Sequence, residues 1–374
     1  MDSKKENKVI MFQRGSIEAG VTLDLNDEIL ELLNTMVVGS NGARYLHKNI
    51  AERINQLPNK YFMYLRKNGS IKGTFVSAQR SITEDFGEAN SYYIRYLAMD
   101  EMFQATKQKK IKHGKPDGII KGLTKKFLSK APIDFGIGYG ERKDLPSFHY
   151  AFFDVQNFRS TDLSELLGMN PVGEFKNMTF TRLNPKGSSH IHKLKKEEYP
   201  KMREFIGKQY KDFSVYTEQF LFAKGNYFVW KIDGEIIAGV QPNKCEWEVK
   251  HMGGISGKMM LGVLPLIPKS KEVFDPKKFE FLTLDYFYIK PGFEKEFELL
   301  IEGMLLEFDV KFALIFQDVK SPFMPMLESF DFGMLSNFSK VPNGKIMMTT
   351  NKISEDQINQ ITSKPFFTCG VDMS

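Results

Sequence analysis

The sequence predicts an α/β protein made of two similar domains, each a mixed, mostly antiparallel sheet flanked by helices. Apolar runs with the pattern of strands alternate with amphipathic runs of helical spacing along the 374-residue chain. The order of these runs repeats after about 165 residues, which exceeds the period of solenoid proteins and indicates two copies of one domain. The residues Asn184–Ser189, rich in Pro, Gly and Ser, have the composition of a linker and lie between the two copies. We expect one domain at 1–184 and the other at 190–374.

Local signals define the elements of the first half. Asn26 is a suitable helix cap before two acidic residues, and Asn68-Gly69 between β-rich runs predicts a hairpin. The glycines of FGIGYG at 135–140 precede no helical pattern, so we interpret them as a turn. The expected elements are a strand at Val9–Gln13, helices at Asn26–Met36 and Ala43–Leu57, a hairpin of Tyr61–Lys67 and Ile71–Ala78, a central strand at Tyr92–Met99, a strand at His149–Val155, a short helix at Asn157–Met169 and a strand at Phe175–Arg182.

The second half follows the same order. The clearest matches are Tyr61-Phe62 with Tyr227-Phe228, Asn68-Gly69 with Asp233-Gly234, and Gly73 with Gly239. The segment Asn243–Lys278 interrupts the repeat and could be a lid or a dimer contact. The expected elements are a strand at His190–Leu194, helical segments at Lys196–Tyr210 and Glu218–Ala223, a hairpin of Tyr227–Ile232 and Glu235–Val240, a central strand at Phe281–Ile289, a helix at Phe293–Phe308, a strand at Lys311–Asp318, a helix at Phe323–Phe330 and a strand at Lys345–Thr350.

A basic loop between a strand and a helix, together with the helix that follows it, is the strongest functional signal in the first half. Asp117 is the one acid between Lys107 and Lys130, and Gly114 and Pro116 fit a loop that opens into a helix. Backbone N–H groups at such a junction form an anion site, so we expect a phosphorylated ligand here; a solvated lysine face is the alternative. The lysines are Lys107, Lys109, Lys110, Lys112, Lys115, Lys121, Lys125, Lys126 and Lys130.

Composition limits the class of protein. The net charge of +6 is modest for this length and arises largely from the basic loop, so we expect a local anion site and no nucleic-acid partner. Two cysteines exclude a disulfide scaffold. No apolar run reaches the roughly 18 residues that a membrane span needs, and no secretory signal begins the chain. We therefore expect a cytoplasmic protein without a membrane partner.

The element order and one local motif resemble the GNAT (Gcn5-related N-acetyltransferase) superfamily, once in each half. The motif is the family's end motif, an Asn followed at spacings of three by a small residue and a Leu, then a Tyr position and a Gly-aromatic pair. In the first half it reads Asn157, Ser160, Leu163, Ser164, Gly168 and Met169. The second half is more degenerate and reads Lys320, Phe323, Met326, Leu327, Asp331 and Phe332.

The resemblance implies that acetyl-CoA or another acyl-CoA binds the first domain. It places the pantetheine arm on the backbone of Leu97, Ala98 and Met99, with a hydrogen bond from Asn157. The phosphate-loop pattern is incomplete in both halves. In the first half, the phosphates would lie near Lys110, Lys112, His113, Gly114 and Lys115. In the second half, Glu294, Glu296 and Glu298 open the helix and would repel a pyrophosphate.

The residues offer several candidates for chemistry. The position of the family's Tyr acid holds Ser164, which could relay a proton, and His149 and Glu88 are candidate acid-base groups. Arg95 and Asp285 lie at matching points of the two central strands and could line substrate pockets; structural salt bridges are the equal alternative. His190 and His192 lack further ligands at a set spacing, so we expect no metal.

Three functional classes stay open on the sequence. The first is an acyl-CoA-dependent N-acyltransferase, in particular an N-acetyltransferase, acting on the amine of a small molecule or peptide. The second is an aminoacyl-tRNA-dependent transferase similar to the Fem peptidoglycan enzymes, which are also tandem. The third is a GNAT-fold binding protein whose catalytic motifs have decayed. A homodimer is compatible with each.

Overall fold

The structure is a computed structural model of the chain. It describes residues 7–39, 43–99, 119–154, 164–165, 167–253, 257, 261, 274–333 and 343–373. No helix among these residues is long and apolar enough to cross a membrane. The basic loop at 100–118 and most of the predicted helix at Asn157–Met169 lie outside the described residues.

Strands dominate the described part of the chain. The strands are β1 (Lys8–Arg14), β2 (Ile17–Thr22), β3 (Arg44–His47), β4 (Lys60–Lys67), β5 (Ser70–Glu84), β6 (Gly87–Met99), β7 (Ser147–Asp154), β8 (Asn170–Thr181), β9 (Ile191–Lys193), β10 (Phe228–Ile232), β11 (Glu235–His251), β12 (Phe279–Ile289), β13 (Phe312–Asp318) and β14 (Gly344–Asn351). The helices are α1 (Asp27–Asn34), α2 (Ile50–Gln56), α4 (Ile119–Leu128), α6 (Tyr199–Gln209), α8 (Glu294–Glu307), α9 (Met324–Glu328), α10 (Glu355–Ser363) and α11 (Gly370–Met373), with short 3-10 turns η1 (Pro132–Phe135), η2 (Lys196–Glu198) and η3 (Ala223–Gly225).

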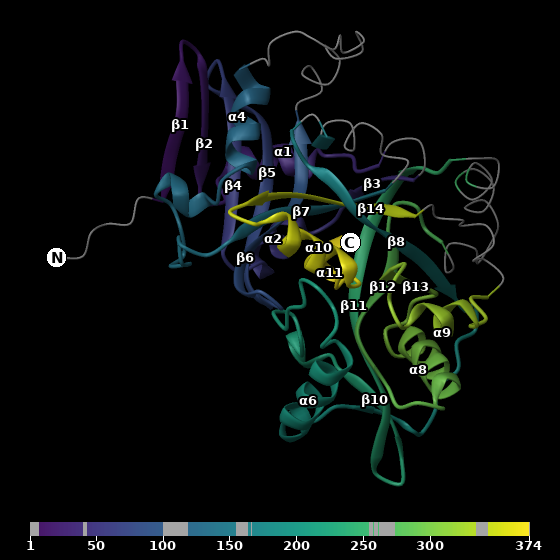
Figure 1. The fold of residues 1–374 in the computed structure, drawn as a ribbon. Coiled ribbons are helices and arrows are strands. Elements are labelled where there is room, and N and C mark those ends of the chain that lie inside the picture. The colour runs from purple at the N-terminus through teal and green to yellow at the C-terminus, as the bar shows by residue number, and fades with distance from the viewer. Residues whose placement is uncertain are drawn as a thin grey trace.

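The described strands form one continuous sheet. Its order is β1-β2-β4-β5-β6-β7-β14-β8-β13-β12-β11-β10-β9, with β3 added to β11. Figure 1 shows β1, β2, β4, β5 and β6 on one side of the molecule and β8, β11, β12 and β13 on the other, with α10, α11 and the C-terminal end in the middle. Most neighbouring strands are antiparallel; the β6-β7 and β12-β13 pairs are parallel.

Strand pairing confirms the internal repeat. The turns Asn68-Gly69 and Asp233-Gly234 both have positive φ angles, a conformation that favours Asn, Asp and Gly. The ladders also shift at equivalent places, between Leu65 and Arg66 in β4 and between Trp230 and Lys231 in β10.

The register corrects one detail of the predicted alignment. Phe75 in β5 pairs with Met63, and Val240, its counterpart 165 positions further on, pairs with Phe228. The predicted match of Tyr61-Phe62 with Tyr227-Phe228 is therefore wrong by one residue. The match of Gly73 with Gly239 is wrong by the same step, because Gly239 is equivalent to Thr74.

The two halves exchange their last strands. β8 ends the first half but pairs along its length with β13, and β14, from the second half, pairs with β7. β8 and β14 also pair with each other at the centre of the sheet. Each half therefore completes the sheet of the other. The proposed division at 184–190 falls between β8 and β9 and stays a prediction.

Two predicted helices are corrected by the structure. The helix expected at Ala43–Leu57 is β3 followed by α2, because Arg44–His47 pairs with β11 and Asn49 has a left-handed φ of 55°. The segment Glu218–Ala223 forms turns that lead into η3. The segment Asn243–Lys278 also begins as strand, since β11 continues to His251.

Other local predictions are confirmed. The side chain of Asn26 accepts a hydrogen bond from the Ile29 N–H at 2.9 Å and caps α1. Gly136 and Gly140 have positive φ angles in a turn after η1, with no helix following.

The exchange of β8 and β14 predicts one cooperative unfolding transition. Met347 lies in β14 and is fully buried, so Met347→Ala should cost about 2–5 kcal/mol and lower the melting temperature of the whole protein. Scanning calorimetry of the full chain checks this. Met36→Ala, at a partly buried position in a loop, is the control and should have a smaller effect. Two separate transitions would contradict the coupling of the halves.

Candidate functional site

Each half of the sheet contains a fork, where two parallel strands separate. In the first fork, β6 and β7 pair at four positions, and the last pair is Tyr93 with Tyr150. Beyond this pair the described residues of β6 and β7 no longer pair with each other, while β7 stays paired with β14. In the second fork, β12 and β13 separate after Thr283 and Leu314.

A bulge lies just beyond the last pair in both forks. Arg95 pairs with Val76 and Ala98 with Thr74, so β6 has one extra residue between the pairs. β12 has the same irregularity after Asp285. In each strand the next residue is a Tyr with positive φ, 55° at Tyr96 and 51° at Tyr286, which is uncommon for a bulky side chain. The predicted equivalence of Arg95 and Asp285 is confirmed.

His149 lies at the apex of the first fork, on one face of the sheet. Its ring stacks on Tyr92 with 4.9 Å between centroids, and its Nε2 is 2.9 Å from the carbonyl oxygen of Lys130, just after α4. The side chain is 1% exposed, and burial lowers its pKa to about 4. Nδ1 has no hydrogen-bond partner in the described part of the chain. The imidazole is therefore neutral at pH 7.

On the opposite face, four side chains form what we call the apex clamp: Arg80, Tyr93, Tyr150 and Asp372. One guanidinium nitrogen of Arg80 donates to the Tyr150 hydroxyl at 2.9 Å, and another contacts Asp372 Oδ1 at 2.6 Å. The Tyr93 hydroxyl donates to the backbone oxygen of Asp372 at 2.8 Å. Burial by itself would lower the pKa of Arg80, but Asp372 and Tyr150 raise this pKa above its usual range. Both residues of the last β6-β7 pair are thus held by one buried ion pair.

The second fork is occupied by the protein itself. The Phe287 N–H donates to the Tyr210 hydroxyl at 2.9 Å, and the Ile289 N–H donates to Gln209 Oε1 at 3.1 Å. Phe323 packs on Phe287 and Tyr210 in the same region. By register, Phe287 and Ile289 are equivalent to Leu97 and Met99 of β6. Their backbone is therefore already bonded at the positions that the resemblance assigns to a pantetheine arm.

The loop after β12 is also bonded internally. The Gly292 N–H donates to Glu294 Oε1 at 3.1 Å, so a carboxylate of the chain itself bonds this loop. Glu298 is buried and contacts Arg182 at 3.2 Å and Lys295 at 2.8 Å.

The predicted cofactor-binding residues fall into two groups. Leu97, Ala98 and Met99 lie on the part of β6 that extends into the first fork, and among the described side chains none is bonded to the Leu97 amide. The remaining six lie outside the described residues: Lys110, Lys112, His113, Gly114, Lys115 and Asn157.

Two further catalytic candidates differ in their placement. Ser164 is 3% exposed, and its carbonyl accepts hydrogen bonds from the N–H groups of Leu167 and Met169, which pack in the hydrophobic cluster on the His149 face. Glu88 is not brought to the fork. It lies near the start of β6, where its side chain is 62% exposed and pairs with Arg142 at 3.0 Å.

The two charged residues beside the bulges are both buried. The guanidinium of Arg95 lies 4.2 Å from the ring centroid of Tyr96. Asp285 accepts hydrogen bonds from the Asn243 amide at 2.8 Å and the Gly370 N–H at 2.5 Å. Burial raises the pKa of Asp285 to about 7. Asp285 is therefore held by amide groups of the protein at the second fork.

Sequence reasoning missed the apex clamp. Arg80 lies in β5 beyond the end of the predicted hairpin strand at Ala78, and Asp372 lies in a segment to which no element was assigned. The available signal is an arginine that continues the predicted strand beyond Ala78, because an arginine buried in a sheet needs a partner.

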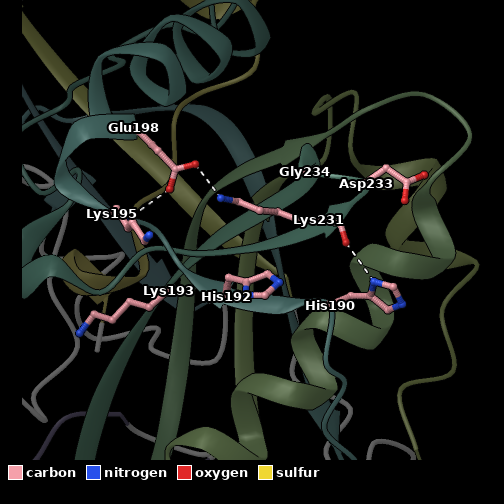
Figure 2. A pocket seen from close by; sticks show the side chains of 8 residues that line it. All are labelled: His190, His192, Lys193, Lys195, Glu198, Lys231, Asp233 and Gly234. Carbon is pink, nitrogen blue, oxygen red and sulfur yellow. Dashed lines mark hydrogen bonds and ion pairs between the residues drawn. The ribbon is translucent and has the colours of Figure 1, made fainter.

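A cavity of about 520 Å³ lies at the edge of the sheet, apart from the forks. Figure 2 shows two bonds made by Lys231: its side chain contacts Glu198 at 2.6 Å, and its backbone oxygen bonds the His190 ring. Within this cavity the Lys231 and Glu198 side chains bond each other, and Glu198 also accepts a hydrogen bond from the Lys195 N–H. The lining residues are His190, His192, Lys193, Lys195, Glu198, Lys231, Asp233 and Gly234. In the described parts of the chain no cluster of His, Cys, Asp or Glu is suited to hold a metal ion.

Comparison with known proteins gives the fold. No family model and no curated protein matches the sequence. A crystal structure of N-myristoyltransferase from Saccharomyces cerevisiae with bound myristoyl-CoA aligns with a TM-score of 0.57 at 10% identity, over 96% of this chain and 91% of that chain. A second structure of the same enzyme with bound myristoyl-CoA gives 0.54 at 11%, over 98% and 91%. Identities this low establish the fold alone: the chain has a GNAT-type fold over most of its length, as the sequence predicted.

The buried neutral state of His149 predicts a pH-dependent stability. The unfolded chain takes up a proton near pH 6.5 and the folded chain near pH 4, so acid favours unfolding between these values. Because of His149, the free energy of unfolding should fall by roughly 2–3 kcal/mol as the pH is lowered from 7.5 to 4.5. His149→Gln keeps an N–H donor for the Lys130 carbonyl but removes this component. Urea unfolding across this range checks it, with exposed His192→Gln as the control. An equal pH slope in wild type and His149→Gln would contradict the assignment.

Proposed function

We propose that the protein is an acyl-CoA-dependent N-acyltransferase in which the first fork binds the acyl-CoA. The observation that carries this proposal is the contrast between two equivalent forks. The second is closed by Tyr210, Gln209 and Phe323, whereas the described side chains leave the Leu97 amide of the first without such a bond. The fold supports the same function, because the two solved N-myristoyltransferases of this fold contain myristoyl-CoA.

The cofactor would lie between β6 and β7 as an added extended segment. Its pantetheine arm hydrogen-bonds the backbone of Leu97, Ala98 and Met99, and Asn157 contributes a further bond. The phosphates lie on the basic loop, at Lys110, Lys112, His113, Gly114 and Lys115, before the start of α4. The internal bond of Gly292 to Glu294 supports a single site, because the second loop presents a carboxylate where an anion would bind.

The reaction needs little beyond positioning. The amine nitrogen attacks the thioester carbonyl carbon, the C–N bond forms and the C–S bond breaks. The amine nitrogen loses one proton, and the leaving thiolate takes up one proton. His149 lies at the apex and is neutral at pH 7; because burial lowers its pKa to about 4, its contribution would be to accept a hydrogen bond from the amine at Nδ1 and not to hold a proton. Ser164 can relay a proton to the leaving thiolate. The position of Glu88 at the far end of β6 gives it no part in this scheme.

The acceptor is an amine on a small molecule or a peptide. Arg95, beside the bulge, orients a negatively charged group of that acceptor, and the second domain completes the acceptor pocket. Asp285 is bonded within the second domain, and its contribution is to hold that domain's fork. We place the protein in the cytoplasm, without a nucleic-acid or membrane partner, and a homodimer is compatible with the proposal.

Calorimetric titration with coenzyme A, acetyl-CoA and myristoyl-CoA tests the proposal. We expect one molecule per chain. Replacing Lys110, Lys112 and Lys115 together by Ala should weaken binding on the order of ten-fold or more and reduce its salt dependence, because exposed charges act through screened attraction. The matched control replaces Lys193, Lys195 and Lys196, far along the sheet, and should leave binding unchanged. Two molecules per chain would contradict the single site, and no binding would contradict the function.

A further inference from the structure

The second fork holds a segment of the chain that follows α10. Residues 364–373, which we call the docked segment, enter beside Ser214, whose N–H donates to the Pro365 oxygen and whose own oxygen accepts the Phe367 N–H, both at 2.9 Å. The Phe366 N–H donates to Asp318 Oδ2 at 3.0 Å, at the end of β13. The Thr368 hydroxyl donates to the Phe316 oxygen at 2.8 Å.

Aromatic packing fills the remaining space. The ring of Phe367 contacts Tyr210, Tyr216 and Tyr286, and Phe367 is 4% exposed. Tyr286 is the positive-φ residue of the second bulge. The docked segment therefore contacts β13 on one arm of the second fork and β12 on the other, so it bridges the opening that a ligand would need.

The same segment then reaches the first fork. After Gly370 has bonded Asp285, α11 brings Asp372 against β5 and β6. Asp372 is 2% exposed and Arg80 is 4% exposed. Together they hold the hydroxyls of Tyr93 and Tyr150, which form the last pair before β6 and β7 separate. Ten residues thus connect the interior of one fork to the apex of the other.

We propose that the second fork serves as the docking site for this segment, and that the segment, through Asp372, sets the geometry of the first fork. Asp372 is then a positioning residue for the ligand of the first fork. The part of this inference that concerns coenzyme A rests on the proposed function; the connection between the forks does not.

The physical basis is the cost of an unpaired buried charge. Loss of Asp372 would leave the Arg80 guanidinium buried without its counter-charge, so the apex would rearrange or admit water. The parallel pairing of β6 and β7 covers four residue pairs and ends at Tyr93 and Tyr150, and beyond Tyr93 the strand β6 stays paired with β5 on its other edge. Loosening of the clamp should therefore increase opening of β6 beyond Tyr93 before it affects the rest of the sheet.

Hydrogen exchange of the full chain tests the connection. Asp372→Asn removes the charge and keeps the shape, and Thr368→Val removes one bond inside the second fork alone. Glu298→Gln is the matched control: Glu298 is a buried carboxylate that contacts the guanidinium of Arg182 at 3.2 Å, and its partners Arg182 and Lys295 lie outside residues 364–373, β5 and β6. If Asp372→Asn does not fold, Arg80→Gln with Asp372→Asn replaces it as a neutral pair.

We expect exchange of the amides in Ile94–Met99 to rise on the order of ten-fold more in Asp372→Asn than in Glu298→Gln, with a smaller rise in Thr368→Val. Coenzyme A should bind these two variants more weakly, still at one site per chain. An equal effect of Glu298→Gln, or no effect of Thr368→Val on Ile94–Met99, would overturn the inference. If wild type binds no coenzyme A, the proposed function fails, and the exchange comparison still decides whether the docked segment controls the first fork.

Discussion

The structure depends on one backbone constraint, which is the bulge that follows the last parallel pair in each central strand. A strand with one extra residue loses its hydrogen-bond register with one of its two neighbours. The extra residue is accommodated by a left-handed φ at Tyr96 and at Tyr286. The parallel partner cannot follow, so the pair separates. Backbone N–H and C=O groups along the separating edges then need other partners, because unpaired buried polar groups cost free energy.

The two halves satisfy this requirement in different ways. In the second half, side chains from α6 bond the β12 backbone and residues 364–373 bond β13. This solution makes the second fork part of the hydrophobic core, as its buried phenylalanines show. The first half keeps a Tyr pair and a buried ion pair at the apex and apolar side chains on the other face. The two forks therefore differ in which neighbouring segments supply hydrogen bonds to the separating strands.

Sequence reasoning predicted the parts that local chemistry determines. Asn68-Gly69 and Asp233-Gly234 predicted both hairpins, and Asn26 predicted the start of α1. It failed where pairing partners are distant in the chain. Arg44–His47 has the spacing of a helix yet adds to β11, some 200 residues away, since tertiary pairing overrides weak helical propensity. The Arg80–Asp372 pair spans 292 positions and has no local signature.

The exchange of β8 and β14 has a consequence for synthesis of the protein. A ribosome delivers β7 long before β14, so the edge of β7 that β14 covers stays without its partner until almost the whole chain has emerged. An apolar edge strand left open in this way can pair with other nascent chains. The ribosome adds about half of the chain between the end of β7 and the end of β14, so this edge stays open for about half of translation, and codon changes that slow the ribosome after β8 would lengthen that exposure.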